Sequence, residues 1–317
     1  MRAAVVKELG RPPEVADVPE PEAGADELVL EVLASSLNPI DINVGAGRFY
    51  GGHPDFPYVP GAEGVGRVAE DGRIVWASGQ GIGTARDGAL AERAVVPAAA
   101  ATPVPDGADP ELAVALGVAG MAGWLPLAWR TPVQPGETVL VLGATGAVGL
   151  VAVQAARILG AGRVVAAGRR PEGLARAEEL GADATVRIGE VDDLAAAFKD
   201  ACGGDGPTLV VDPLWGEPLV AAVKAAAAGA RSVNIGQSAG PEATLASGDV
   251  RGKQLEILGY SNFTVPREVR DREYQRLVRH ALSGDIRLEI ERVTLEEIGP
   301  AWERQAQGAG TKIVVLP

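Results

Sequence analysis

The chain has 317 residues, of which 47% are hydrophobic and 22% are charged. These are ordinary values for a globular enzyme with one large domain or two smaller ones. The formal net charge of −13 is a poor match to nucleic acid or to an anionic membrane surface. The single cysteine, Cys202, excludes an internal disulfide and a cysteine-rich zinc site.

The chain shows no sign of a targeting segment. Residues 1–7 are too few and too soon charged for a secretory signal, and they predict a first strand. We expect no uncharged apolar run to reach the ~18 residues that a membrane span needs. The alanine-rich stretch 219–230 contains Lys224 and predicts a helix of ordinary length. We therefore expect no membrane contact, no nucleic-acid partner and, by default, a cytoplasmic location.

The first part of the chain is typical of a β domain. Between residues 38 and 61, frequent glycine, proline and asparagine residues predict a long loop or several turns. The Asp71-Gly72 pair predicts a hairpin. Short apolar or alternating runs predict strands at 28–33, 64–69, 73–76 and 89–96.

The pattern changes after Pro110. Residues 110–129 have helical composition, interrupted by glycines and by Pro126, and a regular alternation of strands and helices follows. Such an alternation predicts a doubly wound parallel sheet. The expected strands are 138–142, 163–167, 183–188, 208–211, 232–235 and 255–258, and the expected helices are 148–159, 171–180, 192–201 and 219–228.

The tail resembles the first part of the chain more than the middle. A charged amphipathic helix is expected at 266–283. A strand at 286–293, a helix at 295–307 and a last strand at 312–316 follow. We therefore predict an α/β domain inserted into a β domain that both ends of the chain build.

A glycine-rich segment follows the strand 138–142 and opens the next helix. Small residues there let the backbone turn sharply and approach a pyrophosphate, which would sit on the amino terminus of the helix. The alternative is a glycine-rich turn that binds nothing. The predicted cofactor-binding residues of this segment are Gly143, Ala144, Thr145, Gly146, Ala147 and Val148.

The end of the next strand bears on which cofactor is bound. A carboxylate at this point usually bonds the 2′-hydroxyl of NAD, but this chain has Gly168, Arg169 and Arg170 and no carboxylate before Glu172. Two guanidinium groups suit a 2′-phosphate, which they can hold bidentately. We therefore predict NADPH as the cofactor. The alternative is a pair of solvated arginines at a strand end.

These segments together resemble the medium-chain dehydrogenase/reductase superfamily over nearly the whole chain. The resemblance implies a GroES-like catalytic domain from residues 1–114 and 285–317, with a Rossmann dinucleotide-binding domain from 115–284 inserted and the active site in the cleft. It is carried by Asn38-Pro39-Ile40-Asp41, Pro60-Gly61-Ala62-Glu63-Gly64-Val65-Gly66, Ala144-Thr145-Gly146-Ala147-Val148-Gly149 and Lys312-Ile313-Val314-Val315.

Within the superfamily the chain is most similar to the zinc-free quinone oxidoreductase and enoyl reductase branch. Zinc-dependent members have cysteine where this chain has Asn38, histidine where it has Ala62, and a second cysteine near residues 117–118. We therefore expect no metal. Without a metal to stabilise an alkoxide, hydride transfer to a strongly electrophilic small molecule is favoured. Glu63 remains either a structural carboxylate or a polar site residue.

Two residues are candidates for catalysis. Asn38 could donate to a substrate carbonyl or carboxamide, or could simply shape a turn. Tyr50 could be a proton donor, as in enoyl reductases of the superfamily, or could line a pocket or the core. By superfamily position alone, the resemblance also implies cofactor contacts for Asn234, Ile235, Gly236, Asn262, Phe263 and Lys312. Whether Trp215 covers the cofactor or fills the core is left open.

The sequence thus predicts an NADPH-dependent, zinc-independent reductase of quinones or α,β-unsaturated carbonyl compounds. One alternative is an enoyl-thioester reductase. Another is a non-catalytic NADPH-binding protein with a structural or regulatory role. The resemblance implies a homodimer in which the sixth strand of the parallel sheet pairs across a two-fold axis.

Overall fold

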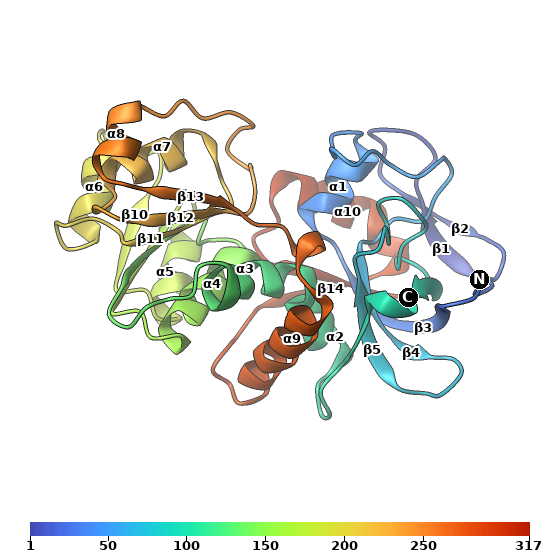
Figure 1. Ribbon diagram of the computed structural model, residues 1–317. Helices are drawn as coiled ribbons and strands as arrows, with labels where there is room; N and C mark the ends of the chain where they lie inside the picture. The colour runs from blue at the N-terminus through green and yellow to red at the C-terminus, as the bar shows by residue number, and fades with distance from the viewer. The chain divides into compact units, whose positions relative to one another are not determined.

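The computed structural model describes all 317 residues, and the chain divides into two compact units (Figure 1). The first unit comprises Met1–Met121, Val265–Ser283 and Leu288–Pro317. The second comprises Ala122–Thr264 and Gly284–Arg287. The first unit is therefore discontinuous in sequence, as the tail predicted.

The first unit is built on a seven-stranded sheet that joins both ends of the chain. Its order is β14-β15-β3-β4-β5-β7, with β6 also pairing with β3. The carboxy-terminal β15 runs antiparallel to β3, which places residues 314–315 beside residues 35–36. A separate pair, β1 with β2, completes the unit. The strands are β1 (Arg2–Val5), β2 (Glu14–Asp17), β3 (Glu27–Ser36), β4 (Glu63–Val68), β5 (Ile74–Ser78), β6 (Arg93–Pro97), β7 (Ala101–Pro103), β14 (Ile290–Thr294) and β15 (Lys312–Leu316).

Helix α9 (Arg267–Leu282) belongs to this first unit, together with α1 (Pro39–Gly45), α2 (Pro110–Ala115), the π-helical turn η2 (Leu116–Gly120) and α10 (Ile298–Gln307). The predicted boundaries instead assigned residues 115–284 to the Rossmann domain. Buried contacts account for the difference. The ring of Tyr274 stacks on Trp76 with centroids 4.4 Å apart, and its hydroxyl donates to the carbonyl of Ala113 at 2.9 Å.

The second unit contains the predicted doubly wound sheet. All six strands are parallel, in the order β10-β9-β8-β11-β12-β13. Helices α4 and α5 cover one face and α6 and α7 the other (Figure 1). The strands are β8 (Thr138–Leu142), β9 (Arg163–Gly168), β10 (Ala184–Arg187), β11 (Leu209–Asp212), β12 (Arg231–Asn234) and β13 (Glu256–Gly259); the helices are α3 (Met121–Leu125), α4 (Ala147–Ile158), α5 (Pro171–Glu179), α6 (Leu194–Ala201), α7 (Gly216–Ala225) and α8 (Ser247–Gly252).

Part of the predicted loop after residue 38 is the helix α1. Asn38 is its N-cap, Pro39 occupies the first turn and Asp41 reaches back to accept the backbone N–H of Asn38 at 2.8 Å. The other carboxylate oxygen of Asp41 accepts the N–H of Ala62 at 2.8 Å. A cap residue, a proline at the first position and an acid at the third are signals for a helix start, and they could have predicted α1.

One expectation about apolar segments was wrong. No charged residue occurs from 112 to 129, and the helical stretch Pro110–Arg130 is long and apolar enough to cross a membrane by length and composition. In the structure, however, 72% of its most apolar 18-residue window is buried inside the protein. A mostly buried core helix passes the same test, because the interior of a protein selects for the same side chains.

Asp41 generates a prediction about pH and stability. Burial raises the pKa of Asp41 from 3.8 to about 6, so between these values the folded protein holds this proton more tightly than the unfolded chain. Protonation therefore stabilises the fold, and this stabilisation is lost as the pH rises through that window. Relative to Asp41→Asn, the parent's free energy of unfolding should fall by up to about 3 kcal/mol from about pH 4 to about pH 7.

Urea titrations of both proteins at several pH values measure this difference. Asp41→Asn keeps the shape of the side chain but removes the titrating proton. A difference between the two proteins that stays flat, or that rises with pH, would contradict the assignment.

Candidate functional site

The glycine-rich segment forms an open turn between β8 and α4. Gly149 packs directly over Gly143, whose carbonyl oxygen leaves no room for a side chain at 149. Gly146 is the N-cap of α4, and no side chain caps the helix. The first N–H groups of α4 are thus left for an external acceptor, and a helix amino terminus favours an anion. Residues 143–148 form this turn, and their contact with a cofactor stays a prediction.

The end of β9 packs against the same turn. A side chain at Gly168 would collide with the methyl group of Thr145, and the guanidinium group of Arg170 donates to the carbonyl of Thr145. Arg169 is exposed beside it. The parallel register places Arg187, the last residue of β10, opposite Gly168, and its Nε donates to the carbonyl of Arg169 at 3.3 Å.

Arg187 is therefore a third arginine at this edge, and no sequence motif predicted it. Its Nη1 also pairs with Glu190 at 2.6 Å. Only the pairing register of β9 and β10 brings Arg187 to the predicted phosphate-binding arginines, so a local signal could not have identified it.

On the other side of β8, the ends of β11 and β12 are joined through Asp212. Its buried carboxylate accepts the amide Nδ2 of Asn234 at 3.0 Å, while the N–H of Ile235 donates to its carbonyl at 2.8 Å. Burial raises the pKa of Asp212, while hydrogen bonds from Trp215, Asn234 and Leu214 lower it. Gly236 has no room for a side chain, because a Cβ there would lie 2.7 Å from the carbonyl oxygen of Pro213. The predicted residues 234–236 thus lie together at the carboxyl edge of the sheet.

The remaining predicted pair of this unit follows β13. Asn262 and Phe263 lie in a short 3₁₀ turn, and the side chain of Asn262 is hydrogen-bonded to the hydroxyl of Tyr260. Phe263 is 41% exposed. Both residues therefore lie beyond the carboxyl end of a parallel strand, where doubly wound sheets bind their ligands.

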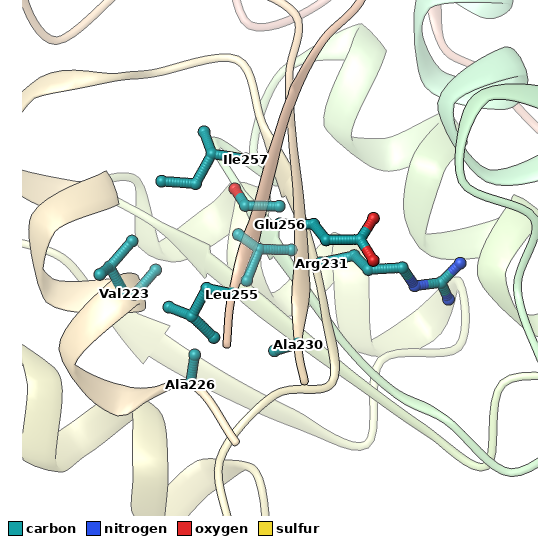
Figure 2. A pocket seen from close by; sticks show the side chains of 10 residues that line it. Val223, Ala226, Ala230, Arg231, Leu255, Glu256 and Ile257 are labelled. Carbon is teal, nitrogen blue, oxygen red and sulfur yellow. The ribbon is translucent and has the colours of Figure 1, made fainter. Parts of the chain in front are cut away.

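A small apolar pocket lies at the opposite, amino ends of β12 and β13 (Figure 2). It contains the buried hydroxyl of Ser232, which has no hydrogen-bond partner. Because nucleotides bind at the carboxyl edge of such sheets, this pocket does not correspond to the predicted cofactor site.

The first unit contains a second cluster of polar groups, around the fully buried Glu63. One oxygen of its carboxylate accepts the indole N–H of Trp76 at 2.9 Å and the backbone N–H of Val118 at 2.7 Å. The other accepts the hydroxyl of Ser36 and the amide of Asn38, the latter at 2.8 Å. The ammonium group of Lys312 lies 3.5 Å from the same oxygen.

Asn38 and Lys312 are held inside this network. The Lys312 ammonium group donates to Asn38 Oδ1 at 2.7 Å and to the carbonyl of Leu37 at 3.1 Å. Lys312 is 3% exposed, and burial lowers its pKa while the charge of Glu63 raises it. Asn38 Nδ2 donates to Glu63 and to Ser36. The polar atoms of Asn38 and Lys312 are thus engaged by neighbouring groups of the same unit, and their predicted contacts with substrate and cofactor stay predictions.

Tyr50 lies on the segment after α1. It is 86% exposed and packs against Phe49 with ring centroids 4.5 Å apart. Tyr50 is therefore not a core residue, and its hydroxyl is open to solvent. Phe49 instead packs against the small cluster of Val6, Val44 and Tyr58.

The residues around Glu63 do not fit a zinc ion. Asn38, Gly117 and Val118 lie against Glu63, and Ala62 precedes it in the chain, but these positions provide an amide, a methyl group and one backbone N–H. Val118 and Asn38 both donate to Glu63, and the Lys312 ammonium group is part of the same cluster. Zinc needs three or four thiolate, imidazole or carboxylate ligands. No group of three or more histidine, cysteine, aspartate or glutamate side chains anywhere in the structure could hold a metal ion.

Two family models match the chain. The model described as alcohol dehydrogenase GroES-like domain matches residues 24–106. The model described as zinc-binding dehydrogenase matches residues 147–281. The first region lies in the discontinuous β unit, and the second starts at the glycine-rich turn and extends into α9.

Known proteins show the same relationship. The chain is 31% identical to the quinone oxidoreductase-like protein 2 homolog of Nematostella vectensis, over 75% of this chain and 66% of that protein. It is 33% identical to the solved quinone oxidoreductase of Thermus thermophilus, with a TM-score of 0.81 and full coverage of both chains. A solved NAD-dependent alcohol dehydrogenase is 29% identical, with a TM-score of 0.89 and full coverage of both chains. Given both domain matches and a 33% identical relative over its whole length, the chain belongs to the medium-chain dehydrogenase/reductase superfamily.

Proposed function

We propose that the chain is an NADPH-dependent, zinc-independent reductase that transfers hydride to quinones or α,β-unsaturated carbonyl compounds. The observation that carries the proposal is the carboxyl edge of the parallel sheet. There, the uncapped amino terminus of α4 lies beside Arg169 and Arg170, and no acidic residue ends β9. A pyrophosphate and a 2′-phosphate are the anions that such an arrangement favours.

The residues of this edge fit NADPH in two ways. The N–H groups at the start of α4 would receive the pyrophosphate, and Gly146, whose nearest neighbour would be 3.8 Å from an added Cβ, leaves the backbone uncovered there. Arg169 and Arg170 would hold the 2′-phosphate. When bound, NADPH supplies the hydride and its electron pair to the acceptor.

The proposed acceptor class follows from the relatives and from the donor set. The Thermus thermophilus relative is named as a quinone oxidoreductase and was also solved in complex with NADPH. Because the chain offers no zinc ligands near Glu63, an acceptor whose carbonyl is already electrophilic is the better match. Charge develops on that carbonyl oxygen, and a hydroxyl such as that of Tyr50 could donate a proton to it.

We further propose a cytoplasmic homodimer. Strand β13 is the last strand of the sheet and pairs only with β12, so no strand pairs with its other edge. A second copy of β13 related by a two-fold axis would pair with it. Light scattering should give twice the mass of one chain, and a monomer at micromolar concentrations would contradict this assembly.

The acceptor class can be tested with a panel. Oxidation of NADPH and NADH should be followed with quinones, enones, enoyl thioesters and simple aldehydes, each with and without a chelator. We expect turnover with NADPH on quinones or enones and no effect of the chelator. Tyr50→Phe should slow enone reduction more than quinone reduction, because a quinone can take its protons from water. Turnover that depends on metal, or on aldehydes alone, would refute the proposal.

The phosphate assignment can be tested with Arg169→Ala and with the double variant that adds Arg170→Ala. Charge-assisted hydrogen bonds are worth about 1.5–3 kcal/mol, so the KM for NADPH should rise roughly tenfold or more while that for NADH changes little. Arg169→Ala alone keeps the bond from Arg170 to Thr145. Arg176→Ala, within α5, is the matched control and should leave both values unchanged. An unaltered NADPH-to-NADH preference in the double variant would rule out these arginines.

A further inference from the structure

The backbone of Trp215 adopts a conformation that only glycine adopts readily. Its φ of 57° is positive and its ψ of −159° is extended, a combination that is found almost only at glycine. A side chain as large as indole makes this conformation costly, and it persists only where the surroundings impose it. Such strain is concentrated at ligand clamps and active sites, so the groups that impose it bear on what the turn does.

The turn that contains Trp215 is held from two sides. The buried carboxylate of Asp212 accepts the N–H groups of Leu214 at 2.9 Å and of Trp215 at 2.8 Å. The segment after β12 holds the same turn, because the N–H of Ala239 donates to the carbonyl of Leu214 at 2.8 Å. Ser238 donates to the carbonyl of Pro213 through both its N–H and its hydroxyl. The strain is therefore maintained by hydrogen bonds at the ends of β11 and β12.

The side chain of Trp215 does not fill the core. It is only partly buried, and its indole makes no hydrogen bond or ring stack. The cost of the backbone conformation is thus not offset by interior packing. The strained residue lies at the carboxyl edge of the sheet, where α7 begins, so a large, flat aromatic residue occupies this edge.

The place of this turn in the sheet indicates which part of a dinucleotide it would meet. Pro213 and Leu214 lie against Gly143, where an added Cβ would be 3.1 Å from each of their side chains. The turn therefore lies directly beside the pyrophosphate-binding turn of β8. The arginines proposed for the 2′-phosphate end β9, on one side of β8, whereas β11 is the neighbour on the other side. A dinucleotide centred on β8 with its adenosine over β9 must extend its other half over β11.

We propose that Trp215 is a cofactor-positioning residue whose indole packs against the nicotinamide half of NADPH. This inference rests on the proposed function. The strained turn, braced by Asp212, holds the ring in place before the cofactor binds, so little ordering is needed on binding. Aromatic stacking prefers offset or edge-to-face contact with a flat ring such as nicotinamide.

The test compares binding of the whole cofactor with binding of its adenosine half alone. Isothermal titration should measure the affinity of the protein for NADPH and for 2′,5′-ADP, which has the adenosine with its 2′- and 5′-phosphates but lacks the second phosphate of the pyrophosphate and the nicotinamide riboside. Trp215→Gly should weaken NADPH binding roughly tenfold, in keeping with the loss of an aromatic contact, and leave 2′,5′-ADP binding unchanged. Trp215→Phe should restore most of the NADPH affinity. Arg169→Ala is the contrasting control, because it should weaken both ligands.

Thermal unfolding of the ligand-free variants provides the structural readout. Glycine adopts a φ of 57° without strain, so Trp215→Gly should melt at or above the temperature of the parent. Equal weakening of both ligands, or a large loss of thermal stability, would make Trp215 a structural residue and overturn the inference. Unchanged NADPH affinity in Trp215→Gly would also overturn it. If the parent binds neither ligand, the proposed function fails, and this inference fails with it.

Discussion

The β unit is organised around the buried carboxylate of Glu63. Glu63 accepts hydrogen bonds from β3, β5 and η2, and its charge is balanced by Lys312 of β15. Removing an ion pair from water costs several kcal/mol for each charge, and the cost is recovered only if every lone pair finds a donor. Here both carboxylate oxygens are satisfied. Loss of one partner would leave an uncompensated charge in the interior, so these elements must assemble together.

This constraint explains two features of the local sequence. Gly117 must be a glycine, because a side chain there would collide with the Glu63 carboxylate and the Trp76 indole. The backbone at Gly117 departs from helical geometry, with a ψ of −112°, and the next N–H, that of Val118, meets Glu63. Lys312 comes from the other end of the chain, so the network also joins the carboxy-terminal strand to the first part of the fold. The positions that provide zinc ligands in zinc-dependent members of the superfamily thus belong, in this protein, to a network of buried charges and hydrogen bonds.

In the parallel unit, the topology of the sheet determines where the candidate cofactor site lies. Parallel strands all end at the same edge, so the turns after β8, β9, β11 and β12 come together although they are far apart in sequence. Hydrogen bonds then set their details. Asp212 fixes the turn of Trp215 and the amide of Asn234, and Arg170 is bonded to the turn at Thr145. The same edge therefore combines an anion-binding helix end, a cluster of arginines and a strained tryptophan.

The sequence by itself determined the doubly wound sheet, the glycine-rich turn and the two-part β domain, because strand and helix periodicity and glycine spacing are local signals. Signals for α1 were also present, in the Asn38-Pro39-Ile40-Asp41 segment, but the density of turn-forming residues around it favoured a loop. Only the tertiary structure decided the partners of Asn38 and Lys312, the place of Arg187 and the strain at Trp215. Each of these depends on strand register or on contacts between residues distant in sequence, and burial then determines which polar groups are engaged and which remain open.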